Sequence, residues 1–192
     1  MSHPATFPVA VTAALVLLLA LPGAAQHGAP HGGHHGARQE GAPPQPYAGM
    51  ESRRIKALSD EDVAALLAGR GMGLALAAEL NGYPGPMHVL EHAAALRLRP
   101  AQQATAQALR DRMAGEARAI GARIVALEEE LDRLFAGDAA ETGSLATLTA
   151  SIGALNGRLR EVHLATHIAM RDALDLEQRA TYARLRGYGA GR

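Results

Sequence analysis

The sequence predicts an all-α protein, and three observations lead to that class. Ala and Leu dominate the apolar residues, while only two Phe, four Tyr and no Trp occur among 192 residues. This composition suits close-packed helices better than strands. Two long segments repeat apolar residues at alternating intervals of three and four, the period of an amphipathic helix. Outside the expected helices no segment alternates Val, Ile or Thr as a strand does. We expect a long antiparallel helical hairpin with short flanking helices, after a signal peptide and a disordered linker.

The N-terminal segment, residues 1–25, is typical of a secretory signal peptide. Val9 to Leu21 is an uncharged apolar run of thirteen residues, and the small residues Gly23, Ala24 and Ala25 follow it. A membrane-spanning helix needs about 20 apolar residues, so the run is short for that purpose. We therefore expect an exported protein, with an uncleaved membrane anchor as the alternative.

Residues 26–50 are rich in Gly, Pro and His and contain almost nothing apolar to bury. Such a composition predicts a disordered linker. The linker contains four histidines, His27, His31, His34 and His35. They either bind metal ions weakly or are part of a soluble linker that has no role in metal binding. The folded domain is expected over residues 51–192.

Three short helices are expected at the start of this domain. Ser59, followed by three acidic residues, is a good N-cap for a helix that runs toward Gly69. A second helix is expected over residues 74–80. The rigid turn at residues 83–86 ends in a proline that can open a third helix, over residues 87–96.

Two long helices and a final short one follow. From Pro100 to Phe135 the seam positions are Met113, Ile120, Ile124, Leu127, Leu131 and Leu134. Gly137 and Asp138 should end that helix. The seam of the second long helix is Leu145, Leu148, Ile152, Leu155, Leu159 and Val162. The matching patterns predict that the two helices pack as a hairpin. Asp175 and Gln178 then form a capping box for a last helix that ends near Leu185.

Two stretches resemble each other at the heads of these helices, Leu98-Arg99-Pro100-Ala101-Gln102 and Leu174-Asp175-Leu176-Glu177-Gln178. They resemble the paired L-T-x-x-Q motif of the Spy/CpxP-like periplasmic proteins, a superfamily that includes periplasmic heavy-metal sensors. The resemblance covers residues 86–187. Physically the motif is a helix start, in which the Thr caps the helix and the Gln returns to the cap backbone. Asp175 can cap in place of Thr, whereas Arg99 cannot.

The resemblance implies a periplasmic location, a homodimer and one of two functions. Spy-like members are ATP-independent chaperones that hold unfolded clients on the concave face of a helical dimer, and CpxP-like members also damp envelope-stress signalling. The sensor members bind nickel, cobalt, copper or zinc through histidines of an early helix and of the hairpin's end. The implied partners are therefore unfolded envelope proteins or a membrane signalling protein.

Two HxxxH pairs carry the metal hypothesis, His88 with His92 and His163 with His167. A step of four residues puts both imidazoles of a pair on one helix face, at a separation that one divalent ion can bridge. Copper, nickel, cobalt and zinc all remain possible. The alternative is that both pairs are ordinary polar residues at the surface or at an interface of amphipathic helices.

The resemblance also implies a carboxylate ligand near Leu109 and a softer ligand near the end of the hairpin. Because Leu109 cannot ligate a metal, Asp111 or Glu116 would have to replace the carboxylate. Met170 is a possible thioether ligand, which would favour a soft ion such as Cu(I).

Several function classes are excluded or disfavoured. Nineteen basic residues balance nineteen acidic ones, so no global field attracts nucleic acid, and the absence of Cys excludes thiolate sites and disulfides. Residues 88–92 (HVLEH) match the H-x-x-E-H zinc-protease pattern, with Glu91 as base and Glu161 as a conceivable third ligand. Such proteases need an α/β scaffold that this chain does not supply. No Glu-x-x-His, nucleophile elbow or phosphate loop occurs.

We therefore expect a protein that is not an enzyme and has no small-molecule substrate. The leading prediction is a periplasmic metal-binding protein that acts in heavy-metal sensing or resistance or in the envelope-stress response. The alternative is an ATP-independent chaperone that binds unfolded clients on the helical hairpin.

Overall fold

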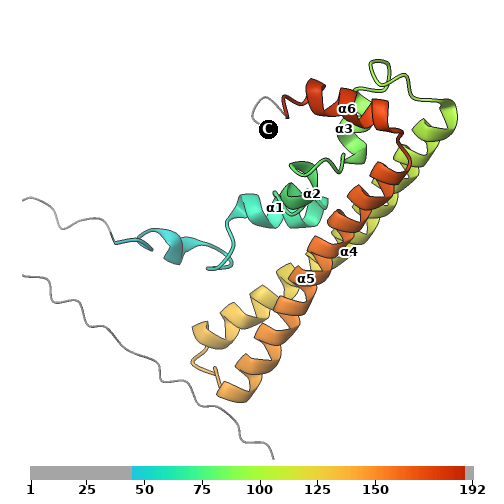
Figure 1. Ribbon diagram of the computed structural model, residues 1–192. Coiled ribbons are helices and arrows are strands. Elements are labelled where there is room, and N and C mark those ends of the chain that lie inside the picture. The colour runs from blue at the N-terminus through green and yellow to red at the C-terminus, as the bar shows by residue number, and fades with distance from the viewer. Residues whose placement is uncertain (1–44, 189–192) are drawn as a thin grey trace, which may run out of the picture. The chain divides into compact units, whose positions relative to one another are not determined.

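The computed structural model describes residues 45–188 and confirms the all-α class (Figure 1). The predicted signal peptide, most of the predicted linker and the four tail histidines lie outside the described residues. Within the described part the elements are η1 (Met50–Ser52), α1 (Asp60–Ala68), α2 (Leu76–Glu79), α3 (Pro86–Glu91), α4 (Pro100–Ala136), α5 (Thr142–Asp172) and α6 (Leu176–Leu185). The one extended feature in this range is an isolated bridge between Ile55 and Leu58. None of the described helices is long and apolar enough to cross a membrane.

Helices α4 and α5 form the predicted antiparallel hairpin and pack along each other (Figure 1). The expected seam is confirmed in α5, where Leu148, Ile152, Leu159 and Val162 are buried. In α4 the completely buried residues include Ala106 and Ala117, which the pattern of large side chains did not select. Gly137 caps α4, and Asp138 takes a left-handed φ of 52°, so the helix ends where the sequence predicts.

Helix α1 lies across α4 at a glycine. A Cβ on Gly121 would lie 2.1 Å from the carbonyl oxygen of Leu66, so only glycine permits this close approach of the two helices. The contact buries Val63 and Leu66 against Ala117 and Ile124 in one apolar core. The capping box of α1 is complete, because Ser59 Oγ accepts from the N–H of Asp62 at 3.1 Å and Asp62 Oδ2 accepts from the N–H of Ser59.

The two motif glutamines bond to each other and join the heads of α4 and α6. Gln102 Nε2 donates to Gln178 Oε1 at 2.8 Å, and Gln178 Nε2 donates to Gln102 Oε1 at 3.0 Å. Each amide also donates to a backbone oxygen, of Ala173 and Leu96 respectively. At the same time each Oε1 accepts from the N–H of its own N-cap residue. The repeated motif therefore builds one buried polar clasp.

Helix α3 is shorter than the sequence predicts, and this changes the geometry of one histidine pair. The expected helix over 87–96 ends at Glu91, with His92 as its C-cap. The N–H of Leu98 donates to the carbonyl of Ala93, and Arg97 takes a left-handed φ of 49°. This turn brings the buried Leu96 and Leu98 into a second apolar core, beside Val89 and Met170. The burial of two leucines outweighs the continuation of the helix.

Candidate functional site

His163 and His167 lie side by side inside the protein, on the same face of α5. Their side chains are almost fully buried, at 2% and 9% exposure. Toward the hairpin's tip, Leu159 belongs to the core around α1, and toward its base Met170 belongs to the core around α3 and α6. The histidine pair thus forms a polar layer between two apolar cores. The predicted step of four does place both imidazoles on one face.

Two loops close over this layer, each with a glycine at the contact. A Cβ on Gly85 would lie 3.0 Å from His167 Cε1 and 3.1 Å from its Nε2. A Cβ on Gly71 would lie 4.0 Å from His163 Cε1. Residues 71–87 therefore form a lid on the imidazoles, and their backbone approaches His167 as closely as glycine allows.

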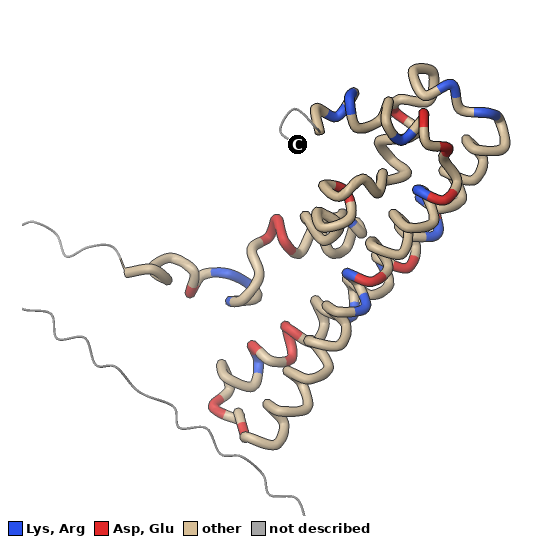
Figure 2. The backbone as a smooth tube through the Cα atoms, in the orientation of Figure 1, with Lys and Arg blue, Asp and Glu red and all other residues tan. Residues whose placement is uncertain are grey.

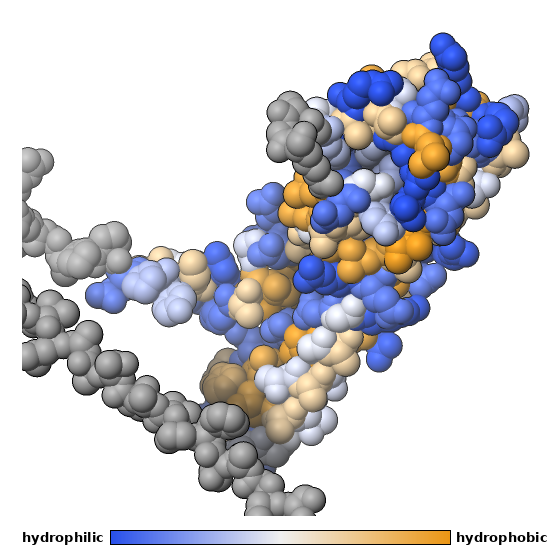
Figure 3. Space-filling view, in the orientation of Figure 1, coloured by the Kyte–Doolittle hydropathy of each residue, from blue (hydrophilic) through white to orange (hydrophobic). Residues whose placement is uncertain are grey.

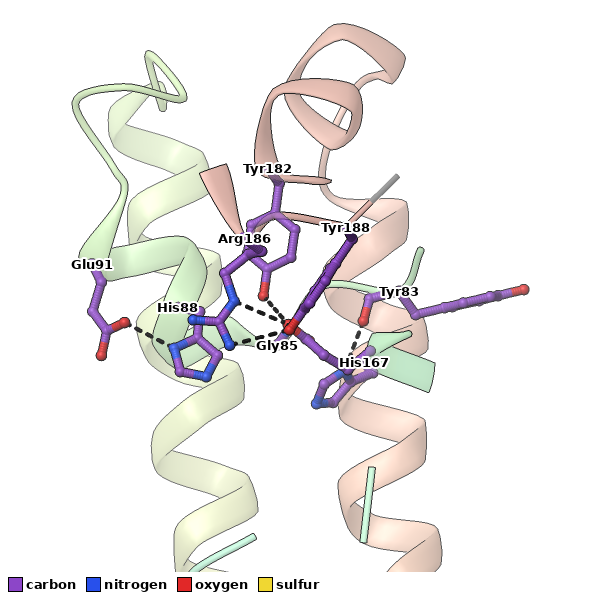
Figure 4. Close-up of polar contacts among 9 residues, drawn as sticks. Tyr83, Gly85, His88, Glu91, His167, Tyr182, Arg186 and Tyr188 are labelled. Carbon is purple, nitrogen blue, oxygen red and sulfur yellow. Dashed lines mark hydrogen bonds and ion pairs between the residues drawn. The ribbon is translucent and has the colours of Figure 1, made fainter. Parts of the chain in front are cut away.

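The orientation of His167 is fixed by its Nδ1 atom. Nδ1 lies 2.7 Å from the carbonyl oxygen of Tyr83 and 3.6 Å from Glu79 Oε2 (Figure 4). A carbonyl oxygen only accepts, so Nδ1 must carry the proton. In the neutral ring the lone pair is then on Nε2, which is the tautomer that a metal ion requires at that nitrogen.

His163 provides a second imidazole nitrogen without a partner. Its Nε2 is buried and has no hydrogen-bond partner among the described residues. Burial, assisted by the neighbouring His167, lowers the pKa of His163. The ring is therefore held neutral at pH 7, as a metal ligand must be.

Glu79 is the buried carboxylate of this region, and the sequence reasoning did not select it. Oε1 accepts from Tyr182 Oη at 2.5 Å and from Tyr188 Oη at 3.1 Å, and Arg186 Nε lies 3.5 Å away. Oε2 accepts from the N–H of Gly85 at 3.2 Å. Burial, together with the carboxylate, raises the pKa of Tyr182, so its phenol stays protonated and donates. One signal was visible in the sequence: Glu79 is the single charged residue between 71 and 87.

The other predicted pair is more open and is not joined to the first. His88 Nδ1 lies 2.8 Å from Glu91 Oε2, and this hydrogen bond lowers the pKa of Glu91. The His88 side chain is 27% exposed. His92 stands at the C-cap, outside the regular helix. Figure 4 shows His88 and Glu91 directed toward each other, with Arg186 between them and the tyrosines in this view.

The remaining predicted ligands lie elsewhere. Asp111 is exposed, and hydrogen bonds from Gln107 and Arg110 lower its pKa. Glu116 faces Arg158 at 3.5 Å, in a hollow of about 230 Å³ between α4 and α5 that the histidines do not line. Met170 is completely buried in the apolar core.

Over residues 45–188, no three His, Asp or Glu side chains gather as a metal-binding group. What the fold assembles is a pair of buried imidazoles with a carboxylate behind one of them. Two neutral imidazoles can bind a transition-metal ion, and the carboxylate can orient the ring that it faces.

Comparison with known proteins adds no further assignment: the chain matches no protein-family model, no curated protein and no solved structure.

Proposed function

We propose that this chain is an exported, periplasmic metal-binding protein in which His163 and His167 bind one transition-metal ion, in metal sensing, metal resistance or the envelope-stress response. The observation that carries the proposal is the unpartnered Nε2 of His163, buried one helical turn from a second imidazole. A buried polar atom without a partner costs about 1–3 kcal/mol. A metal ion would give that nitrogen its partner.

The surroundings of His167 support the same proposal. Protein histidines that bind metals nearly always donate their other N–H to a backbone carbonyl or a carboxylate, which fixes the ring. His167 Nδ1 has such a bond, to the carbonyl of Tyr83, and the carboxylate of Glu79 lies 3.6 Å from the same nitrogen. Neutral imidazole suits copper, nickel, cobalt and zinc.

The test is calorimetric titration of the full chain with Cu(II), Ni(II), Co(II) and Zn(II). The reference protein carries Ser at His27, His31, His34 and His35, so that the tail cannot contribute. We expect one ion per chain to bind with at least micromolar affinity. His163→Leu and His167→Gln should each lose that binding, because each removes one of the two nitrogens.

His88→Gln is the matched control, since it removes an imidazole of the other, more exposed pair. It should leave the affinity within about twofold. Circular dichroism and thermal melts of each variant establish that it is folded. Absence of stoichiometric binding, or binding that survives both substitutions on α5, would overturn the proposal.

One observation favours the chaperone as a second candidate function. Large apolar side chains are exposed on the lid and its flanks, at 47–56%: Leu67, Met72, Leu76 and Met87. The lid carries no charged residue except the buried Glu79. Figure 3 shows hydrophobic surface around α1 and α2, and Figure 2 shows few charges along α2.

If the protein is a chaperone, we propose that its clients are unfolded envelope proteins and that its active form is a homodimer. Met72→Ser with Leu76→Ser should reduce suppression of aggregation of a denatured client, measured by light scattering. Phe135→Ser, which removes an equally exposed apolar side chain from the far end of α4, is the control. Equal suppression by all three proteins would exclude the lid as the client surface. Sedimentation of the full chain tests the dimer.

A further inference from the structure

Glu79 links three segments that are distant in sequence. From α2 its carboxylate contacts Gly85 in the lid, His167 in α5, and both Tyr182 and Tyr188 near the C-terminus. Glu79 as a residue is 8% exposed. Because all these partners contact the same carboxylate, a movement of one of them shifts the carboxylate and so changes its contacts with the others.

On the side of α5, Glu79 acts on the nitrogen that fixes His167. Its Oε2 lies 3.6 Å from Nδ1 and also accepts from the Gly85 N–H, on the loop segment that supplies the Tyr83 carbonyl. Two acceptors therefore face Nδ1, and the same carboxylate holds the loop from which the second one comes. Without Glu79, the carbonyl would be the single acceptor for Nδ1, on a loop that had lost its own bond.

On the C-terminal side, Glu79 holds the end of α6 and the residues after it. Tyr182 and Tyr188 both donate to Oε1, and Arg186 Nε lies 3.5 Å from the same atom. Arg186 Nη2 also donates to Tyr188 Oη at 3.2 Å. In Figure 4 the hydroxyl groups of Tyr182 and Tyr188 and the guanidinium of Arg186 converge beside His167. No other acidic side chain of the described residues forms an ion pair with Arg186.

We propose that Glu79 is the positioning residue of the histidine pair, and that through it metal binding at His163 and His167 and the docking of the C-terminal segment, residues 176–188, stabilise each other. This inference rests on the proposed metal function and assigns its regulation. The coupling is reciprocal by thermodynamic necessity: whatever loosens residues 176–188 weakens metal binding, and metal protects residues 176–188. A partner that grips the C-terminal segment would therefore read the state of the metal site.

The experiment uses the full chain with Ser at the four tail histidines, so that the tail cannot bind Ni(II). It compares this protein, the wild type of the experiment, with Glu79→Gln, Tyr188→Phe and the control Glu177→Gln. Glu177 is an exposed carboxylate at the start of α6. Three quantities are measured: the tautomer of His167 from ¹⁵N imidazole shifts without metal, hydrogen exchange of residues 176–188 with and without Ni(II), and the calorimetric Ni(II) affinity. Ni(II) is used as the single probe ion.

In Glu79→Gln we expect His167 to become a mixture of tautomers, and hydrogen exchange of residues 176–188 to rise without metal. The Ni(II) affinity should fall about 10-fold or more, which is the usual cost of losing a group that orients a metal ligand. Tyr188→Phe should keep the tautomer, raise exchange of the segment and weaken Ni(II) binding less. Glu177→Gln should match the wild type in all three.

The failures of the two proposals are distinguishable. If the wild type binds Ni(II) and Glu79→Gln equals it in affinity and tautomer, the inference is overturned while the metal function stands. If the wild type does not bind Ni(II), the metal function and the coupling are both overturned. In that case the metal-free tautomer and exchange data still decide whether Glu79 ties His167 to the C-terminal segment. An effect of Glu177→Gln equal to that of Glu79→Gln would also count against the specific role of Glu79.

Discussion

At the scale of single residues, three buried side-chain nitrogens of the described residues lack a hydrogen-bond partner, and His163 Nε2 is the one that belongs to an imidazole. His163 Nε2 is buried without a hydrogen bond, while His167, one turn further, has its Nδ1 on a carbonyl. A buried imidazole in this state is stable only as the neutral form. Because, of these two rings, only that of His163 is left without a partner, we expect protonation or metal binding to change the stability of the folded protein mainly at His163.

His163→Leu should therefore make the protein less sensitive to acid. The lowered pKa of His163 means that the unfolded chain, with a pKa near 6.5, binds the proton more readily than the folded protein. Well above pH 6.5 neither the folded nor the unfolded state binds this proton, so His163 does not make the stability depend on pH there. As the pH falls from 6.5 toward the lower pKa of the folded protein, the unfolded state is protonated first and the protein loses stability. Urea unfolding at pH 7.5 and pH 5 should show a smaller loss in His163→Leu than in the wild type.

At pH 7.5 the same variant should be as stable as the wild type or more stable, by about 1 kcal/mol, because an unsatisfied nitrogen is replaced by an apolar side chain of similar size. His88→Gln, at the half-exposed ring, should keep the wild-type difference between the two pH values. If His163→Leu keeps it as well, His163 is not the group that titrates.

The sequence could predict His163 and His167 as a pair because the signal is local. Residues four apart on a helix share a face whatever the rest of the chain does. Glu79 carried no comparable signal, since its partner Tyr182 lies 103 residues further along the chain. Asp111 and Glu116 were chosen by position relative to the motif, and each contacts charged or polar surface residues instead. Non-local contacts decide which carboxylate enters a site.

At the scale of helices, close approach depends on small residues at the crossing points. Gly121 lets α1 lie against α4, and the completely buried Ala106 and Ala117 line the same face of α4. The pattern of large apolar residues predicted that α4 and α5 pair, and they do. It could not predict that a short helix would cross at a glycine, because a small residue gives no periodic hydrophobic signal.

Gly121→Ala should destabilise the protein by about 2–3 kcal/mol, because the added Cβ would meet the Leu66 carbonyl oxygen and force α1 away from α4. Gly115→Ala, six residues earlier in the same helix, adds its methyl group to open space and should stabilise by up to about 1 kcal/mol through helix propensity. Urea denaturation of both variants measures the difference. Equal effects of the two substitutions would mean that α1 does not pack as described.

The clasp between α4 and α6 makes a second prediction at this scale. Gln102→Ala and Gln178→Ala should each cost about 2 kcal/mol, because each leaves a buried amide and a backbone carbonyl short of a partner. The double variant should cost less than the sum by at least about 0.5 kcal/mol, since the second substitution removes an amide already without its partner. Gln107→Ala, on the surface of α4, is the control, and strict additivity would contradict a direct bond between the glutamines.

At the scale of the whole described chain, the long hairpin supports two separate apolar cores with the histidine layer between them. One core gathers α1 against the middle of the hairpin, and the other gathers α3 and α6 near its base. The sequence predicted the hairpin and most of its helix ends. It did not predict that the fold divides into two cores, because each core joins residues from four or more distant segments.

This division predicts a gradient of stability along the hairpin. No residue from 126 to 147 is buried, and Phe135 at the tip is 60% exposed. Besides the contacts between α4 and α5, the structure ties this part of α4 to the rest of the chain only by the surface pairs of Arg54 with Glu129 and of Lys56 with Asp132. Between 159 and 170, by contrast, α5 buries Leu159, Val162, His163, Thr166, His167 and Met170. Local opening costs least where the fewest apolar contacts are lost. In hydrogen exchange, amides of residues 130–147 should therefore exchange at least about tenfold faster than those of residues 159–170, and Phe135→Ser should leave the slow group unchanged. Uniform protection along both helices would show instead that the hairpin opens as one cooperative unit, and that the layer at His163 and His167 is no more rigid than the tip.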